Sequence, residues 1–444
     1  MIYVEKVKQY EFKERTILVF FLKTSRWVWL ADNKLVLSFP FPADSLSNMG
    51  DAVAFSLLPL AYFEHTDIRL APTLTVSPSL QSRVDAICSL WNEWYDGQRR
   101  IRITAPMESK PYYNAKRVAA QLFSGGVDSL YTFARNSEEI TYLVLFHGAD
   151  VSASDNETFS KIERQAQDFA KEFGKRLRVF STNVRFLSRV SWEYMAHVCA
   201  MIAPLLACRQ LVHRIYVASS YSGIFGNRYP WGSHPRLDPL ICSDGIETVH
   251  HGFDVKRFEK IVYLSKNPQL LKRVRVCTRA SDVDHQVNCG RCEKCYRTAV
   301  ALKLRGVSGT ESLPSSAFSF LSAMQYLENY QLRITSALFW SEILEFLHKR
   351  NQLSREESEF VAFLEIKLGK TYQDYIEDFE NAPGSFSNIY SCGGRLRNYE
   401  KRVGFAKDSL QILHKLQRLH RGKRYRNFLR DMAKWQQTVT GELC

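Results

Sequence analysis

The chain has 444 residues, of which 45% are hydrophobic and 24% charged, and its formal net charge is +14. A chain of this length can bury the cores of two or three domains, and its composition is ordinary for a globular protein. No run approaches the roughly 18 apolar residues that a membrane helix needs, so no membrane partner is expected. The early apolar run at residues 16–22 has no cleavage site after it, which argues against a secretory signal peptide. A cytoplasmic protein is the simplest inference.

Residues 1–112 alternate strand-like and helix-like patterns, which predicts a small α+β domain. The predicted strands are residues 14–22, 34–39 and 73–77, and the predicted helices are residues 50–63 and 80–95. A polar junction follows, after which a more regular alternation begins.

Residues 113–310 show that regular alternation of strand and helix. The predicted strands are residues 117–123, 140–148, 176–183 and 214–220, and the predicted helices are residues 128–136, 157–174 and 193–211. Short apolar strands separated by helices of this length are typical of a parallel sheet covered on both faces. The sequence therefore predicts a Rossmann-like α/β domain.

Residues 311–444 are predicted to be helical and basic. Amphipathic patterns cover residues 319–330, 338–350 and 359–370, and Ser354 with Glu357 forms a capping box before the last of these. Between Arg395 and Lys434 there are 13 Lys or Arg residues against three acids. This excess fits either a helical face packed on an acidic partner or contact with a phosphate-rich partner, such as RNA or a nucleotide-bearing substrate.

The stretch LFSGGVDSLYTF, residues 122–133, places two glycines between a predicted strand and a predicted helix. Ligands of parallel α/β domains bind beyond the carboxyl ends of the strands, where this loop lies. Gly125 and Gly126 let backbone N–H groups approach an anion, and the start of the helix adds partial positive charge. Ser124 and Ser129 add hydroxyl donors. The loop is therefore predicted to hold pyrophosphate, although it matches neither a Walker P-loop nor the dinucleotide fingerprint.

This loop resembles the SGGxDS signature of the PP-loop ATP pyrophosphatases, which cleave ATP between the α- and β-phosphates and leave AMP on the substrate. The resemblance implies ATP as cofactor and a cradle for the leaving pyrophosphate. The cradle would consist of the hydroxyls of Ser124 and Ser129 and the backbone amides of Gly125, Gly126 and Val127.

The same resemblance implies roles for three further residues. Asp128 would orient Mg²⁺ or cap the helix. Phe146 and His147 end the second strand of the domain, where such folds grip adenosine, so they are candidates for lining that pocket. For His147, a hydrogen-bonded core histidine is an equally good interpretation.

Four of the ten cysteines, Cys277, Cys289, Cys292 and Cys295, form a C-x11-C-G-x-C-x2-C cluster. Four thiolates at such spacing suit tetrahedral Zn²⁺, and a turn at Gly290 lets the last three surround one ion. The cluster therefore predicts a structural zinc site. A redox-active or persulfide-carrying C-x2-C pair is the alternative.

A CGxCxxC knot downstream of SGGxDS resembles 7-cyano-7-deazaguanine synthase and its relatives, over roughly residues 115–305. The family has a basic helix before the first zinc cysteine, so Arg257 and Lys260 are candidates for substrate or nucleotide contact, or for a solvated helix face. The long extensions on both sides indicate a divergent relative with a different substrate. Comparable layouts occur in UDP-N-acetylmuramoyl-peptide glutamate epimerases and in synthase-like proteins of antiviral defence operons, which attach a deazapurine to a partner protein.

The segment between the fourth strand and the cysteine cluster, residues 226–254, is rich in His, Asp and Pro. Because it follows a strand of the α/β domain, it is predicted to be a substrate loop. His234 and Asp238 are its candidate substrate residues.

These features together predict an ATP-dependent ligase-like enzyme. A carboxylate of a small molecule or partner protein would be adenylated with release of pyrophosphate, and ammonia or an amine would then displace AMP. Two alternatives stay open: a tRNA-modifying enzyme of the thiolation type, and a non-catalytic nucleotide-binding scaffold.

Overall fold

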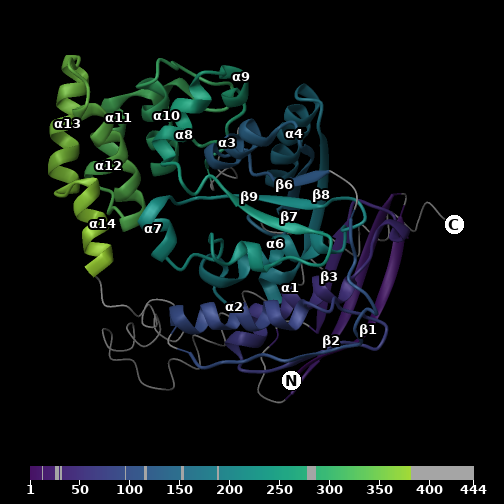
Figure 1. Cartoon of the computed structure of the whole chain (residues 1–444). Coiled ribbons are helices and arrows are strands. Elements are labelled where there is room, and N and C mark those ends of the chain that lie inside the picture. Colours follow the sequence, from purple (N-terminus) through teal and green to yellow (C-terminus); the bar gives the residue numbers. More distant parts are fainter. Residues whose placement is uncertain are drawn as a thin grey trace, which may run out of the picture.

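In the computed structural model of the chain, one ten-stranded sheet carries the helices on its two faces (Figure 1). The structure describes residues 1–12, 14–25, 30, 33–95, 97–114, 118–151, 155–187, 190–277 and 287–381. The strand order is β10-β9-β6-β7-β8-β3-β2-β1-β4-β5. No helix within these ranges is both long and apolar enough to cross a bilayer. The basic segment at residues 395–434 lies outside them.

Five neighbouring strands run parallel and form the half of the sheet predicted for residues 113–310. They are β6 (Ala119–Leu122), β7 (Ile140–His147), β8 (Arg176–Thr182), β9 (Arg214–Ala218) and β10 (Glu247–His251). Chain order proceeds outward from β6 through β7 to β8, and then restarts on the other side with β9 and β10. The order therefore switches direction between β6 and β9, which is where ligands bind in open α/β sheets.

The other half of the sheet comes from the first 112 residues. The antiparallel strands β1 (Ile2–Phe12), β2 (Arg15–Thr24) and β3 (Lys34–Phe39) join β8 through β3, and the two-residue strands β4 (Ile68–Arg69) and β5 (Ile103–Thr104) extend the far edge. The segments predicted as separate domains thus share one mixed sheet.

Two predictions about local structure in this region need correction. The predicted strand at residues 73–77 does not form; only Val76 makes an isolated bridge, to Met107. The backbone N–H and the hydroxyl of Ser77 instead donate to the carboxylate of Asp51, at 2.9 and 2.6 Å, which replaces ladder pairing. The predicted substrate loop is not a single loop, because β10 lies within it.

Helices cover both faces of the sheet (Figure 1). One face carries α3 (Val127–Asn136), α4 (Asn156–Glu172) and α8 (Arg257–Ser265); the other carries α1 (Met49–Phe63), α2 (Leu80–Tyr95) and α6 (His197–Leu206). A π-helical turn at Trp192–Ala196 precedes α6, within the helix predicted at residues 193–211. The short helices α5 (Val184–Leu187), α7 (Gly223–Arg228) and α9 (Pro268–Leu271) complete this part.

The last described part of the chain is helical, as predicted. It comprises α11 (Phe320–Glu328), α12 (Ile334–His348), α13 (Arg355–Leu368) and α14 (Tyr372–Asn381), and it follows α10 (Glu293–Lys303), which lies within the segment predicted as the α/β domain. The capping box of Ser354 and Glu357 is present at the start of α13. Figure 1 shows these helices beside the carboxyl end of β9, with α12 near α8.

The junction between the two halves of the sheet depends on Asn183, which is fully buried. Its side chain accepts from the backbone N–H of Val36 at 2.8 Å and donates to the carbonyl oxygen of Lys34 at 2.8 Å.

We expect Asn183→Leu to lower the free energy of unfolding by about 2 kcal/mol, because both backbone groups lose their partner. Urea unfolding measures this, with Asn351→Leu at an exposed position as the control. Equal losses in the two variants would contradict it.

Candidate functional site

The glycine loop, as we call residues 124–129, connects β6 to the first turn of α3, at the point where the strand order switches. Gly125 has φ of 72°, a conformation that favours glycine, and its carbonyl oxygen accepts from the backbone N–H of Arg275 at 2.8 Å. A Cβ atom on Gly126 would lie 3.3 Å from the carbonyl oxygen of Arg275. The loop therefore needs both glycines to fit against the segment that leads to Cys277. The first N–H groups of α3 point out of its start without intrahelical acceptors, as at any helix N-terminus.

The two serines of the loop have different environments. Ser129 is 3% exposed, and its hydroxyl oxygen accepts from the backbone N–H of Ser124 and from the side-chain amide of Gln121, each at 3.2 Å. Ser124 is exposed, and its hydroxyl accepts from the backbone N–H of Gly126 at 3.2 Å. Ser129 thus shapes the loop from inside, while Ser124 presents its hydroxyl to solvent. Gln121 was not predicted, although a polar residue within an apolar strand was a signal for it.

Asp128 contacts two cations from α8, both of them sequence-predicted candidates. Its carboxylate accepts from the guanidinium of Arg257 and, at 3.1 Å, from the ammonium of Lys260. Burial alone would raise the pKa of Asp128, but these two charges outweigh it and hold the pKa below its ordinary value. Asp128 makes no cap bond to the start of α3, so that half of its prediction is not met. Both oxygens of this carboxylate already contact a cation, and the two positive charges disfavour Mg²⁺ beside it.

Lys260 also connects the two strands that flank the switch point. Its ammonium group is 1% exposed and donates to the carbonyl oxygen of Ser219, just after β9, at 2.8 Å. Through Asp128 it reaches the start of α3, just after β6. The ion pair therefore fixes the two sides of the crevice relative to each other.

Further cations surround this ion pair. Arg275 donates to the carbonyl oxygen of Ser124 at 3.2 Å, and Arg297 pairs with Glu293 at 3.0 Å. Burial, together with the charges of Arg297 and Arg257, lowers the pKa of Lys294. Among the residues in contact with the glycine loop, Arg257, Lys260 and Arg275 outnumber the single carboxylate of Asp128, so the local charge is positive. Such a charge favours an anionic ligand.

The two candidates for the adenosine pocket lie on opposite faces of β7. Phe146 is 6% exposed and packs in the core, where its ring stacks with that of Phe180 at 5.3 Å between centroids. His147 stacks on Phe159 of α4 at 4.2 Å. Of the two, only His147 is on the face of the sheet that carries α3 and α4. Phe146 is a core residue in this structure.

His234 and Asp238, the substrate candidates from residues 226–254, are both fully buried and hydrogen-bonded. The Nδ1 atom of His234 accepts from the backbone N–H of Arg236, and its Nε2 atom donates to the carbonyl oxygen of Asn227, each at 3.0 Å. Burial lowers the pKa of His234 to about 4, so the ring is neutral at physiological pH. Asp238 accepts from the ring of His250 at 2.6 Å. We therefore assign both residues a structural role.

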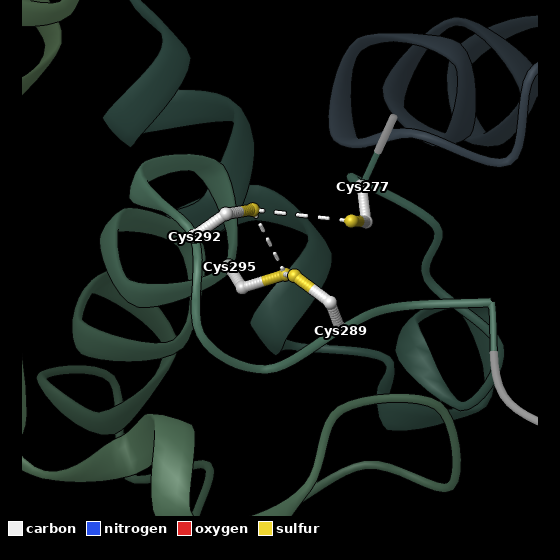
Figure 2. Close-up of side chains that lie close together, drawn as sticks. All are labelled: Cys277, Cys289, Cys292 and Cys295. Atoms are coloured by element: carbon white, nitrogen blue, oxygen red, sulfur yellow. Dashed lines mark hydrogen bonds between the residues drawn. The ribbon is translucent and has the colours of Figure 1, made fainter. Parts of the chain in front are cut away.

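The four cysteines of the cluster converge on one point (Figure 2). Their sulfur atoms lie within 4.8 Å of one another. The shortest separations are 3.5 Å between Cys292 and Cys295, and 3.9 Å from Cys292 to Cys277 and from Cys295 to Cys289. Tetrahedral zinc with Zn–S bonds of about 2.3 Å requires sulfur separations of roughly 3.8 Å. The thiols are therefore placed to bind a metal such as zinc. Gly290 makes the turn with φ of 67°, and a Cβ atom there would lie 2.1 Å from Pro314.

The cysteine cluster is tied to the glycine loop through Asn288, which is fully buried. Its side-chain oxygen accepts from the backbone N–H groups of Val276 and Cys277 at 2.8 and 3.1 Å, and its amide donates to the carbonyl oxygen of Val274 at 2.8 Å. Arg275, in the middle of this segment, holds Gly125. Metal binding at the cysteines would therefore stabilise the segment that supports the loop.

We expect one zinc ion per chain, lost in Cys292→Ser because a closed tetrahedral site needs all four ligands. Elemental analysis of the purified protein measures the content, and Cys242→Ser, outside the cluster, is the control. Wild-type protein without bound metal, or an unchanged content in Cys292→Ser, would contradict the metal assignment.

Removal of the metal should also loosen the glycine loop. Loss of the hydrogen bond from Arg275 to Gly125 is expected to speed amide exchange at residues 123–128 by about fivefold, since one such bond is worth about 1 kcal/mol. Hydrogen exchange of zinc-loaded and chelator-treated protein measures this, with β2 as the internal reference. Equal exchange rates of the loop in both forms would show that metal binding does not stabilise the loop through Arg275.

Comparison with known proteins assigns neither a family nor a function to the chain. No family model matches the chain, and no curated protein or solved structure matches it. The function therefore has to be inferred from the sequence motifs and from the geometry of this site.

Proposed function

We propose that the protein is an ATP-dependent enzyme of the PP-loop type, which adenylates a carboxylate and releases pyrophosphate. The observation that carries this proposal is the position of the glycine loop. It lies at the switch point of the parallel strands, at the start of a helix and beside several cations. Backbone amides, a helix N-terminus and fixed cations together favour a phosphate group.

The loop residues have distinct parts in this reaction. The backbone amides of Gly125, Gly126 and Val127 and the exposed hydroxyl of Ser124 hold the β- and γ-phosphates. Ser129 keeps the loop in shape from inside. The substrate carboxylate attacks the α-phosphorus, the bond to the bridging oxygen breaks, and pyrophosphate leaves into the loop.

In this proposal, Asp128 positions the two cations of α8. It holds Arg257 and Lys260 at the mouth of the loop, where their charge offsets the negative charge that grows on the leaving pyrophosphate. Mg²⁺ bound with ATP would neutralise further phosphate charge. The resulting acyl-adenylate is attacked by ammonia or an amine, and AMP is released.

The cysteine cluster has a structural part in this scheme. Its sulfur atoms face one another, which suits a closed metal site and leaves no open position for substrate. The zinc would stabilise the segment at residues 274–277 and take no chemical step. This arrangement favours the adenylating enzyme over a thiolation enzyme that needs a labile cysteine.

The test is the fate of ATP labelled at the α-phosphate, incubated with Mg²⁺, the full chain and a small-molecule extract. We expect labelled AMP or a labelled adenylate. Ser124→Ala should form it about tenfold more slowly, because one hydrogen bond to a charged oxygen is lost. Ser82→Ala, at an exposed position of α2 on the other face of the sheet, is the matched control.

Labelled ADP as the product would contradict the proposal. Tight ATP binding without turnover, in any extract and with added partner proteins, would favour the nucleotide-binding scaffold instead. Exchange of labelled pyrophosphate into ATP, dependent on one fraction of the extract, would identify the carboxylic acid.

A further inference from the structure

The helices α11 to α14 are called the C-terminal helices here. One of them, α12, packs against the start of α8, the helix that carries Arg257 and Lys260. Glu342 of α12 is 5% exposed, and its carboxylate accepts from the backbone N–H of Phe258 at 2.8 Å. That N–H group belongs to the first turn of α8, where backbone donors have no intrahelical acceptor. Glu342 thus caps α8 from another part of the chain.

Phe339 lies one turn before Glu342 on α12, and its ring is a second contact with the site. The guanidinium of Arg257 lies 5.4 Å from the ring centroid and that of Arg297 lies 4.3 Å from it. The ring also stacks on Tyr221, which follows β9, at 5.9 Å and an interplanar angle of 9°. One aromatic ring therefore touches α8, α10 and the loop after β9.

The residue before α8 is held by the same group of helices. The ammonium of Lys256 pairs with Glu345 of α12 at 2.8 Å and lies 4.1 Å from the ring centroid of Tyr372 on α14. The first turn of α8 is thus fixed by contacts from two C-terminal helices. This turn supplies both cations that neutralise Asp128.

We propose that Phe339 and Glu342 are positioning residues of the nucleotide site, and that the C-terminal helices complete that site by holding Arg257 and Lys260 against Asp128. This inference depends on the proposed ATP-binding function of the glycine loop. It gives the helices after the cysteine cluster a defined role: ATP affinity is coupled to their docking on α8.

The pKa of Glu342 reflects its buried position between α12 and α8. Burial raises the pKa of Glu342 to about 7, although the N–H of Phe258 and the charges of Lys256, Arg257 and Lys260 act in the opposite direction. Glu342 also interacts electrostatically with Arg297 and with Tyr372, and Tyr372 in turn with Glu345 and Glu259. Because the pKa in the folded protein lies above the ordinary value of 4.5, ionisation of Glu342 is disfavoured by folding. The wild type should therefore lose stability relative to Glu342→Gln as pH rises from about 5 to about 7, and the difference should level off above that.

The direct test measures ATP affinity calorimetrically, with Mg²⁺ and the zinc-loaded full chain. Phe339→Leu keeps apolar volume but removes the ring face from two guanidinium groups, so we expect affinity to fall by about five- to thirtyfold. Phe339→Tyr keeps the ring and should stay within about twofold of the wild type. Leu347→Ala, at a fully buried position in the last turn of α12, is the control for lowered stability.

The outcomes separate the two proposals. A wild type that binds no ATP would overturn the proposed function, and this inference with it. A wild type that binds ATP, with unchanged affinity in Phe339→Leu, would overturn the inference alone. A loss of affinity in Leu347→Ala as large as in Phe339→Leu would also overturn it, since the effect would then follow stability. If Phe339→Leu does not fold, the pH dependence of stability in Glu342→Gln decides, and parallel curves for variant and wild type would contradict the docking of Glu342.

Discussion

The contact of Asp128 with Arg257 and Lys260 is the constraint on which the geometry of the site depends. The side chains of these residues are 14%, 15% and 1% exposed, so three charges have been largely withdrawn from water. Such withdrawal costs more than a single ion pair returns, unless further hydrogen bonds satisfy the groups. Here the carbonyl oxygen of Ser219 supplies one of them. A charged cluster of this kind is a poor way to stabilise a fold, but it is well suited to binding an anion at a fixed place.

Two parts of the molecule outside the parallel strands converge on this ion pair. The cysteine cluster supports the glycine loop through Asn288 and Arg275, and the C-terminal helices support α8 through Phe339 and Glu342. The cysteine cluster therefore fixes the backbone that is proposed to bind the phosphates, while the C-terminal helices fix the cations beside that backbone. The first 112 residues act at a greater distance, because their strands extend the sheet beyond β8, on the side away from the switch point.

The sequence allowed the local features of the site to be predicted better than its contacts. The loop at residues 124–129 and the four cysteines were identified because glycine and cysteine have strict geometric requirements. Four of the parallel strands followed from periodicity, but β1, β4, β5 and β10 were missed. The strand predicted at residues 73–77 was wrong, since Asp51 takes its hydrogen bonds. The pairing of Asp128 with α8, about 130 residues later, and the parts of Phe339 and Glu342 depend on tertiary packing, which no local pattern encodes. His234 illustrates the opposite error, because a polar side chain after a strand is as easily a buried structural residue.

A crystal structure of the zinc-loaded full chain soaked with pyrophosphate and Mg²⁺ would test directly whether the glycine loop at the switch point is the pyrophosphate cradle. We expect phosphate density within hydrogen-bond distance of the amides of Gly125 to Val127 and the hydroxyl of Ser124, with Arg257 and Lys260 at its edge. Well-ordered pyrophosphate elsewhere on the molecule, with this loop empty, would contradict it.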